Sequence, residues 1–258
     1  MNKTPIGLQI WSLRDAFGKD MPGTLKAIAD MGYDGVELCR WYAPFVDSFD
    51  KWEAKDIRQA CDDLGLKIVS SHVPYVVIEE KIPELVEFAH AVGMSLAMVA
   101  SVPKENWGKR EGVLAVAEVF NTASRQLAAE GIRIGYHNHD HDFHAIDGEM
   151  PWDIIFSNTD PEFVMQWDTG NAMAAGADPY LYLERYAGRS ALVHLKEYSP
   201  DNEAAAIGQG IMDWERIFDL CDRLHKPEWY IVEQEGGDAA GAMEAAKVCI
   251  DFLRGMGK

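Results

Sequence analysis

The feature that most constrains the fold of this chain is a strand-and-helix unit that recurs eight times along its length. In each unit, a short apolar or β-branched run is followed by a polar loop and then by a segment with the 3.6-residue period of an amphipathic helix. The predicted strands are residues 6–10, 35–38, 67–71, 96–100, 132–136, 163–167, 191–195 and 230–233. The predicted helices are residues 24–31, 53–64, 84–92, 112–130, 152–158, 179–187, 213–225 and 239–254. Asp20 and Asp213 occupy predicted N-cap positions, and four helices are predicted to end at Gly32, Gly65, Gly93 and Gly131.

Eight strands alternating with eight helices over about 250 residues indicate a closed α/β barrel, the (β/α)8 TIM barrel. An open doubly wound sheet is the alternative, and it is expected to carry a glycine-rich turn after its first strand. Here the first strand runs into LQIWSLR, and the chain has neither a G-x-G-x-x-G motif nor a P-loop. No linker or change in composition divides the chain, so we predict one TIM-barrel domain over residues 1–258. Val69, Ile134 and Val193 are expected to fill the interior of this barrel.

Composition argues against several classes of partner. The 258 residues include 24 Lys and Arg against 42 Asp and Glu, which gives a formal net charge of −18 at pH 7. Nucleic acids and anionic membranes are bound by clustered basic residues, and the sequence has no such run. No apolar stretch approaches the ~20 residues of a membrane-spanning helix, and the start, MNKTPIGLQIW, lacks the apolar region of a signal peptide. The cysteines are far apart without C-x-x-C spacing, which indicates reduced thiols. We therefore expect a cytoplasmic protein with no nucleic-acid or membrane partner.

Polar residues gather where the predicted strands end. In a TIM barrel the active site lies at the carboxyl ends of the strands and in the loops that follow them. Six of the eight histidines fall there, whereas His90 and His225 fall in predicted helices. The polar strand-end residues are His72, the run HNHDHDFH at residues 137–144, Asp168, His194, Lys196, Glu233 and Glu235. Each has a structural explanation when taken alone, since Asp168 before Thr-Gly-Asn can cap a helix. Together, however, oxygen and nitrogen donors converging on one mouth predict a site for Mn²⁺, Mg²⁺, Co²⁺ or Zn²⁺.

These motifs resemble those of the xylose-isomerase-like TIM-barrel superfamily, and most closely the bacterial sugar phosphate isomerase/epimerase group, whose barrels are similar to AP endonuclease family 2. The resemblance covers nearly the whole chain, through LQIWSLRDAF, GYDGVEL, SSHVPY, GYHNHDHDF, WDTGN, VHLKEY, GQGIMDW and VEQE. That group includes ketose 3-epimerases, inosose dehydratases and enzymes that act on 3-keto-glycosides.

The resemblance implies one divalent ion, most often Mn²⁺, held by residues from strands five to eight. The family's Asp, His and Glu from strands six, seven and eight correspond to Asp168, His194 and Glu233. For the strand-five ligand, relatives often read HNHxxEF, and this chain has Asp142 where they have Glu. Asp142 or His139 is therefore expected as the first ligand.

The resemblance also implies an isomerase or epimerase that acts on a keto-sugar or related polyol through a metal-stabilised enediolate. Glu233 is expected to act as ligand and as base or acid, with Lys196 and Asp142 as the other catalytic residues. Lys196 lies two residues after His194, so both side chains point to the same face of the strand. The predicted substrate-binding residues are His72, His137, His139, Trp11, Glu37 and Trp107.

The sequence is also compatible with other functions. The same site in a dehydratase or lyase would expel a substituent after proton removal. A nuclease of this superfamily would need a basic DNA-binding face, and the net charge of −18 argues against one. A sugar-binding barrel without catalysis is a third alternative. Gln209 stands where the family loop usually has Glu, and no cluster of Arg or Lys marks a phosphate pocket, so an unphosphorylated sugar is the expected substrate. Barrels of this group often pair through their helices, so a homo-oligomer is also expected.

Overall fold

Eight parallel strands close into a barrel and follow one another in space in the same order as in the chain. The computed structural model describes residues 3–42, 45–224, 226–235 and 239–258. The first strand also pairs with the last, with Ile6 opposite Tyr230, and this pairing closes the barrel. The strands are β1 (Ile6–Gln9), β2 (Gly35–Leu38), β3 (Lys67–Pro74), β4 (Leu96–Ser101), β5 (Arg133–His137), β6 (Val164–Asp168), β7 (Leu192–Leu195) and β8 (Trp229–Val232). The predicted TIM barrel and each of its predicted strands are thereby confirmed.

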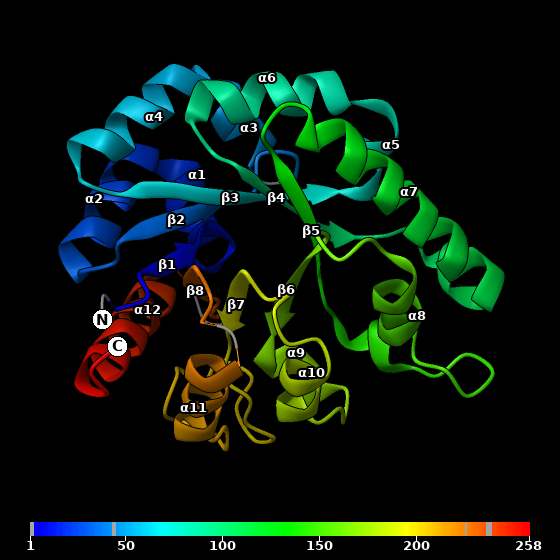
Figure 1. The fold of residues 1–258 in the computed structure, drawn as a ribbon. Helices are drawn as coiled ribbons and strands as arrows, with labels where there is room; N and C mark the ends of the chain where they lie inside the picture. The colour runs from blue at the N-terminus through cyan, green and yellow to red at the C-terminus, as the bar shows by residue number, and fades with distance from the viewer. Residues whose placement is uncertain (1–2, 43–44, 225, 236–238) are drawn as a thin grey trace.

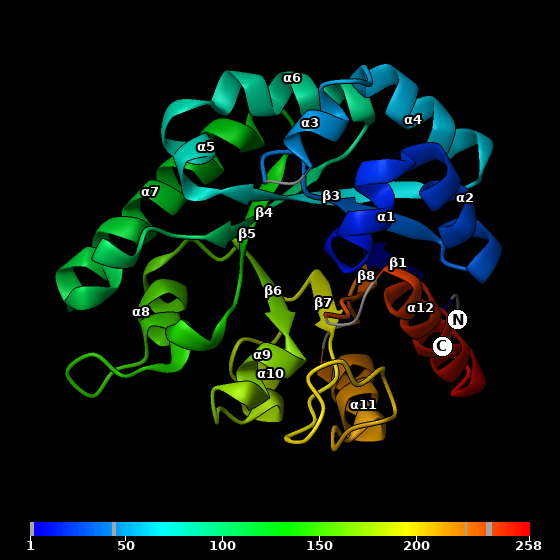
Figure 2. The same ribbon diagram turned by 180° about the vertical axis from the view of Figure 1, so that it is seen from behind.

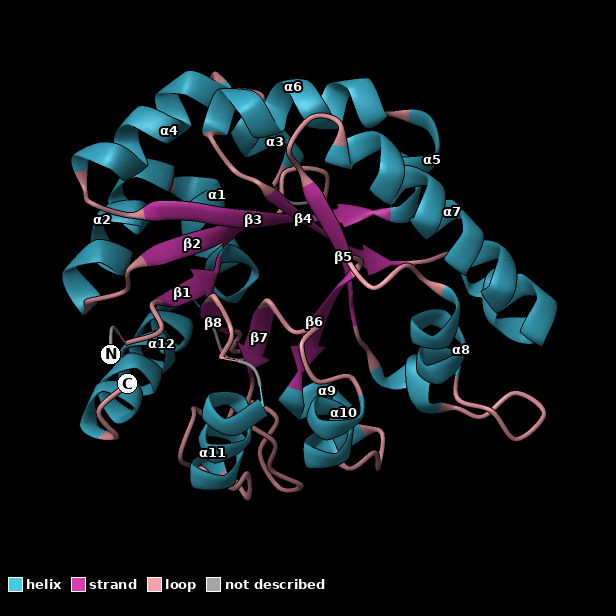
Figure 3. Ribbon diagram, viewed as in Figure 1, coloured by secondary structure: helices cyan, strands magenta, loops and turns pink. Residues whose placement is uncertain are grey.

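Helices surround the barrel on its outer side (Figure 1, and Figure 2 from behind). The main helices are α2 (Met21–Met31), α4 (Ala54–Asp63), α6 (Ile82–Val92), α7 (Arg110–Ala128), α8 (Pro151–Asn158), α10 (Pro179–Arg185), α11 (Trp214–Leu224) and α12 (Ala239–Gly255). Short helices that sequence analysis did not predict lie mostly in the loops after strands (Figure 3). They are η1 (Ile10–Leu13), α1 (Arg14–Lys19), α3 (Val46–Phe49), α5 (Tyr75–Glu80), η2 (Lys104–Gly108), η3 (Asp140–Phe143) and α9 (Thr169–Ala174). His225 lies outside the described residues. Within the described residues, no helix is long and apolar enough to cross a membrane.

The predicted helix ends are also present. Asp20 accepts a hydrogen bond from the Gly23 N–H, at 3.0 Å, and caps α2. Asp213 accepts one from the Arg216 N–H, at 3.0 Å, at the start of α11. The four predicted terminal glycines all adopt positive φ values, in agreement with a left-handed residue at the helix end. They are Gly32, Gly65, Gly93 and Gly131.

The interior of the barrel has an apolar layer beneath a polar one. A compact cluster of buried apolar residues is formed by Val69, Leu96, Met98, Val164, Ala191, Leu192 and Ile231. Because side chains alternate along a strand, the residues two positions further on lie on the same face. His194 therefore lies above Leu192, and Glu233 lies above Ile231. The prediction for Val69 agrees with this arrangement.

Ile134 and Val193, however, were predicted on the wrong face. Both are fully buried and belong to the larger cluster that packs the barrel against its helices. Val193 lies between Leu192 and His194, which face inward, so it must face outward.

Candidate metal centre and active site

Four side chains converge where β5, β6, β7 and β8 end. His137, Asp168, His194 and Glu233 each offer a donor atom, and these atoms all lie within 4.8 Å of one another. Nδ1 of His194 lies 2.9 Å from Oε2 of Glu233 and 3.8 Å from Oδ2 of Asp168. Nε2 of His137 lies 4.0 Å from the same Glu233 oxygen. All four side chains are buried, so this donor cluster is formed away from bulk water.

The donor cluster fits a divalent cation, because several of its buried atoms have no other partner. Among the described residues, neither ring nitrogen of His137 has a hydrogen-bond partner, and neither does Oδ2 of Asp168. A buried polar atom left unpaired costs about 1–3 kcal/mol, so such atoms usually mark a bound water or ion. Oδ1 of Asp168 accepts the Asn171 N–H at 2.6 Å and caps α9. The helix-cap role and a ligand role are thus compatible, since each uses a different oxygen.

Electrostatics at the donor cluster also favour a cation. Burial raises the pKa of Asp168 to about 7; Lys196 lowers this pKa, whereas Glu233 raises it. Burial lowers the pKa of His194, but the carboxylates of Glu37 and Glu233 outweigh it and raise this pKa to about 9. Carboxylates that share a buried space repel one another, and a cation between them removes that repulsion.

The ammonium group of Lys196 lies beside the donor cluster. Its Nζ lies 3.4 Å from Oε1 of Glu233 and 3.0 Å from Oε2 of Glu235. Burial lowers its pKa, but Glu233, Asp168 and Glu235 together hold this pKa above the usual value for lysine. Lys196 is therefore an ammonium group fixed against the carboxylate of the donor cluster.

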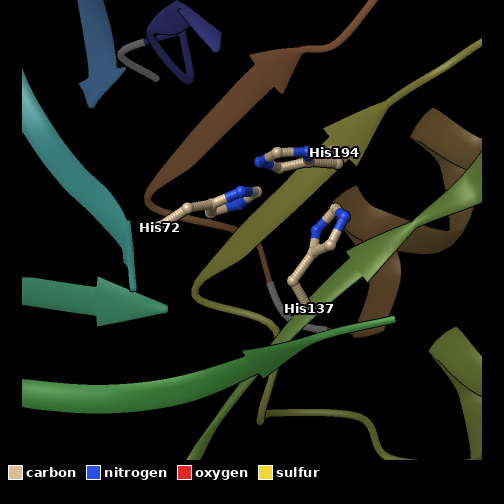
Figure 4. Close-up of side chains that lie close together, drawn as sticks. All are labelled: His72, His137 and His194. Atoms are coloured by element: carbon tan, nitrogen blue, oxygen red, sulfur yellow. The ribbon is translucent and has the colours of Figure 1, made fainter. Parts of the chain in front are cut away.

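Three histidines from β3, β5 and β7 face one another across the mouth (Figure 4). The ring centroid of His137 lies 4.6 Å from those of both His72 and His194. The nitrogens of these three residues form a second group within 4.8 Å. His72, which is predicted to bind substrate, therefore adjoins the donor cluster.

The structure does not bring Asp142 to the donor cluster. Its carboxylate is fully buried, with Oδ1 accepting from the Tyr136 hydroxyl and Oδ2 from the His139 N–H, both at 2.8 Å. Burial raises its pKa to about 7, although both hydrogen bonds lower it. His139 does not join the donor cluster either, and the strand-five position is taken by His137. The sequence signal was that His137 ends the strand itself, whereas Asp142 belongs to the loop.

Glu37, which was predicted to bind substrate, lies beneath the mouth and is not among the residues that line the cavity. Its side chain is fully buried, and Oε2 faces Nε2 of both His72 and His194. Side chains from the neighbouring strands β1 and β3, and from β6, donate hydrogen bonds to it. They are Gln9, Ser70 and Gln166.

A cavity of about 130 Å³ opens beside the donor cluster. It is lined by Trp11, Cys39, Tyr42, His72, Ala100, His137, His139, Glu233 and Glu235. Sequence analysis missed Tyr42, whose hydroxyl is 2.9 Å from Oγ of Ser101. A larger groove of about 520 Å³ involves α4 and α6 but contains no residue of the donor cluster.

The predicted tryptophans are placed differently. Trp11 lines the cavity, as expected for contact with substrate. Trp107 is not among the lining residues, and its ring packs 5.3 Å from that of His141. The short helix η2 thus packs Trp107 against the histidine-rich segment that follows β5.

Comparison with known proteins agrees with this geometry. Residues 25–255 match the xylose isomerase-like TIM barrel family. The chain belongs to this family. The match runs from within α2 to the end of α12 and includes every residue of the donor cluster, whereas β1 precedes it.

Proteins similar to this chain include curated dehydratases and solved structures, one of which contains a zinc atom. Inosose dehydratase of Clostridium beijerinckii is 24% identical over 269 aligned positions, which cover 86% of this chain and 87% of the dehydratase. The crystal structure of a sugar phosphate isomerase/epimerase from Parabacteroides distasonis is 25% identical, with a TM-score of 0.84 and 98% of each chain covered. The IOLI protein, solved with a zinc atom, is 12% identical with a TM-score of 0.79 over 96% of each chain, which is a likeness of fold.

Proposed function

We propose that this protein is a metal-dependent enzyme that removes a proton next to the carbonyl group of a keto-sugar or keto-polyol. The observation that carries the proposal is the set of buried, unpartnered donor atoms beside a cavity that is lined by histidines and glutamates as well as aromatic residues. Family membership supports an enzyme of the sugar-modifying class. A divalent ion held by His137, Asp168, His194 and Glu233 would supply positive charge to the substrate oxygen as the neighbouring proton is removed.

The residues of the chain have separate tasks in this proposal. Glu233 lines the cavity, and Lys196 donates a hydrogen bond to its Oε1 at 3.4 Å, so it is positioned to accept the proton. The ammonium group of Lys196 lies between Glu233 and Glu235 and donates a hydrogen bond to substrate oxygen. His72 and His139 line the cavity and bind substrate hydroxyls.

Elimination of water is the outcome that the cavity favours. Both carboxylates that line it, Glu233 and Glu235, come from the loop after β8, whereas imidazoles come from β3 and β5. An epimerase that uses a carboxylate on each face of its substrate would need a second carboxylate across the cavity, where the lining residues of this chain include the imidazoles of His72 and His139. An imidazole there suits protonation of a leaving hydroxyl group. The likeness to inosose dehydratases supports the same outcome for a cyclic keto-polyol.

Isomerisation or epimerisation of the same class of substrate is the second candidate. It is favoured by the likeness to the sugar phosphate isomerase/epimerase of Parabacteroides distasonis. Both reactions begin with loss of the same proton, so they differ in the product rather than in the first step.

The test is proton exchange and product analysis. Protein loaded with Mn²⁺ or Co²⁺ is incubated in D₂O with 2-keto-myo-inositol and with unphosphorylated ketoses, and the products are analysed by NMR and mass spectrometry. We expect deuterium at the carbon next to the carbonyl group and loss of water from the inositol derivative. Recovery of an epimer without loss of water would instead support the second candidate.

A pair of matched variants assigns the chemistry to the cavity. Glu233→Gln should lower exchange about 10²–10⁴-fold because it removes the base. Glu228→Gln makes the same change at an exposed site, where the carboxylate pairs with Arg133, and should retain exchange. The proposal fails if metal-loaded wild-type protein exchanges no proton with any of these substrates. Sugar binding without exchange would support the non-catalytic barrel.

A further inference from the structure

Glu37 is an acidic residue of the barrel interior whose carboxylate contacts five polar side chains, and it has no role in the proposed reaction. It alternates with Gly35 on β2, so its side chain points into the barrel. Gln9 of β1 and Ser70 of β3 are its partners in strand register, and they bracket its carboxylate from both sides.

We propose that Glu37 is a positioning residue that holds the Nε2–H of both His194 and His72, and thereby directs Nδ1 of His194 into the donor cluster as the nitrogen that binds the metal ion. This inference rests on the proposed function, because it concerns the ligand His194. It adds a residue that touches neither the cavity nor the ion.

The hydrogen bonds around Glu37 show that its carboxylate acts as an acceptor. Oε2 lies 2.6 Å from Nε2 of His194, 3.0 Å from Nε2 of His72 and 2.7 Å from Nε2 of Gln9. Oε1 accepts from Oγ of Ser70 at 2.5 Å and from Nε2 of Gln166 at 2.6 Å. An ionised carboxylate has only acceptor sites, and these five donors use them.

The tautomer of His72 follows from its neighbours. Its Nε2 faces Oε2 of Glu37 at 3.0 Å and Oε1 of Gln166 at 2.8 Å, and both of these oxygens are acceptors. The orientation of the Gln166 amide is fixed because its Nε2 donates to Glu37. Nε2 of His72 must therefore carry a proton, and Nδ1 is the nitrogen that exchanges a proton or hydrogen bond with substrate.

The tautomer of His194 follows from the position of the donor cluster. Its Nδ1 lies among the cluster atoms, near Glu233 and Asp168, whereas its Nε2 points away from them to Glu37. A neutral imidazole binds a metal ion through the nitrogen without a proton. The Nε2–H held by Glu37 therefore assigns ligation to Nδ1, in the way that carboxylates orient histidine ligands in other metal sites.

The first test measures the tautomers directly. Long-range ¹H–¹⁵N NMR spectra of the zinc-loaded wild-type protein report which nitrogen of each imidazole carries the proton. We expect Nε2–H for both His194 and His72. A proton on Nδ1 of either residue overturns the proposal, and this measurement needs no variant that has to fold.

The second test compares two variants by calorimetric titration with Zn²⁺ and Co²⁺. Glu37→Gln keeps the size of the side chain but replaces one acceptor oxygen with a donor that faces other donors. We expect it to lower metal affinity about 10–100-fold. Ser70→Ala removes one hydrogen bond to Oε1 but leaves both histidine contacts, and should bind the ions with near wild-type affinity.

The outcomes separate this inference from the proposed function. If wild-type protein binds neither ion, the metal-dependent function fails. If wild-type protein binds an ion but Glu37→Gln binds it equally well, with unchanged imidazole spectra, the role of Glu37 is refuted. Equal losses of affinity in Glu37→Gln and Ser70→Ala would also refute it, because the histidine contacts would then not be responsible.

Discussion

Adding a divalent ion to the metal-free protein should raise its melting temperature, because the donor cluster exists only in the folded chain. The cluster brings the buried carboxylates of Asp168 and Glu233 together with two imidazoles, and the unpaired atoms gain a partner when an ion binds. At a free-ion concentration 100 times Kd, binding stabilises the folded state by about 2.7 kcal/mol. For a chain of this size, each kcal/mol corresponds to about 2–4 °C. The expected rise is therefore roughly 5–11 °C.

The assay is thermal unfolding of protein dialysed against a chelator, followed by circular dichroism with and without Mn²⁺ or Co²⁺. Asp168→Asn and His137→Ala should abolish the rise, since each removes a donor of the cluster. Asp142→Asn should retain it, because the Asp142 carboxylate is occupied by Tyr136 and by the His139 backbone. The reasoning is refuted if wild-type protein shows no rise with either ion, or if Asp142→Asn folds but loses the rise.

Four further variants probe stability and catalysis. Ile134→Ala should cost about 2–4 kcal/mol of unfolding free energy in urea, because it leaves a cavity between β5 and the helices. Gly135→Ala should cost about 1–3 kcal/mol in the same assay, since the new Cβ would meet the Val164 carbonyl and the Met98 sulfur. Asp20→Ala should cost about 1 kcal/mol through loss of the α2 cap, again by urea unfolding. Lys196→Met should lower kcat about 10²-fold in steady-state kinetics of the folded variant; an unchanged kcat would remove Lys196 from the mechanism.

Sequence periodicity was enough to predict the barrel and most of its donor cluster. Asp168, His194 and Glu233 each end or follow a strand, and parallel strands of a barrel end at one mouth. The placement of these residues therefore follows from strand boundaries alone. Asp142 was misplaced because it belongs to a loop, where no periodicity fixes the direction of a side chain. The η3 turn directs it to Tyr136 instead.

The interior of the barrel was harder to predict because parallel strands are buried on both faces. Ile134 and Val193 are as apolar as the residues that face inward, so hydrophobicity does not distinguish the two faces. The polar strand ends do distinguish them. Counting back two residues from His194 gives Leu192, which belongs to the interior cluster, and counting back two from His137 gives Gly135.

The pairing of β1 with β8 has a consequence for how the chain folds on the ribosome. The two strands that close the barrel lie more than two hundred residues apart in the sequence. At synthesis rates of about 5–20 residues per second, β8 emerges roughly ten to fifty seconds after β1. During that interval β1 has an unpaired edge, and such edges favour pairing with other chains. Expression of this protein should therefore depend on the protection of β1 until the last strand arrives.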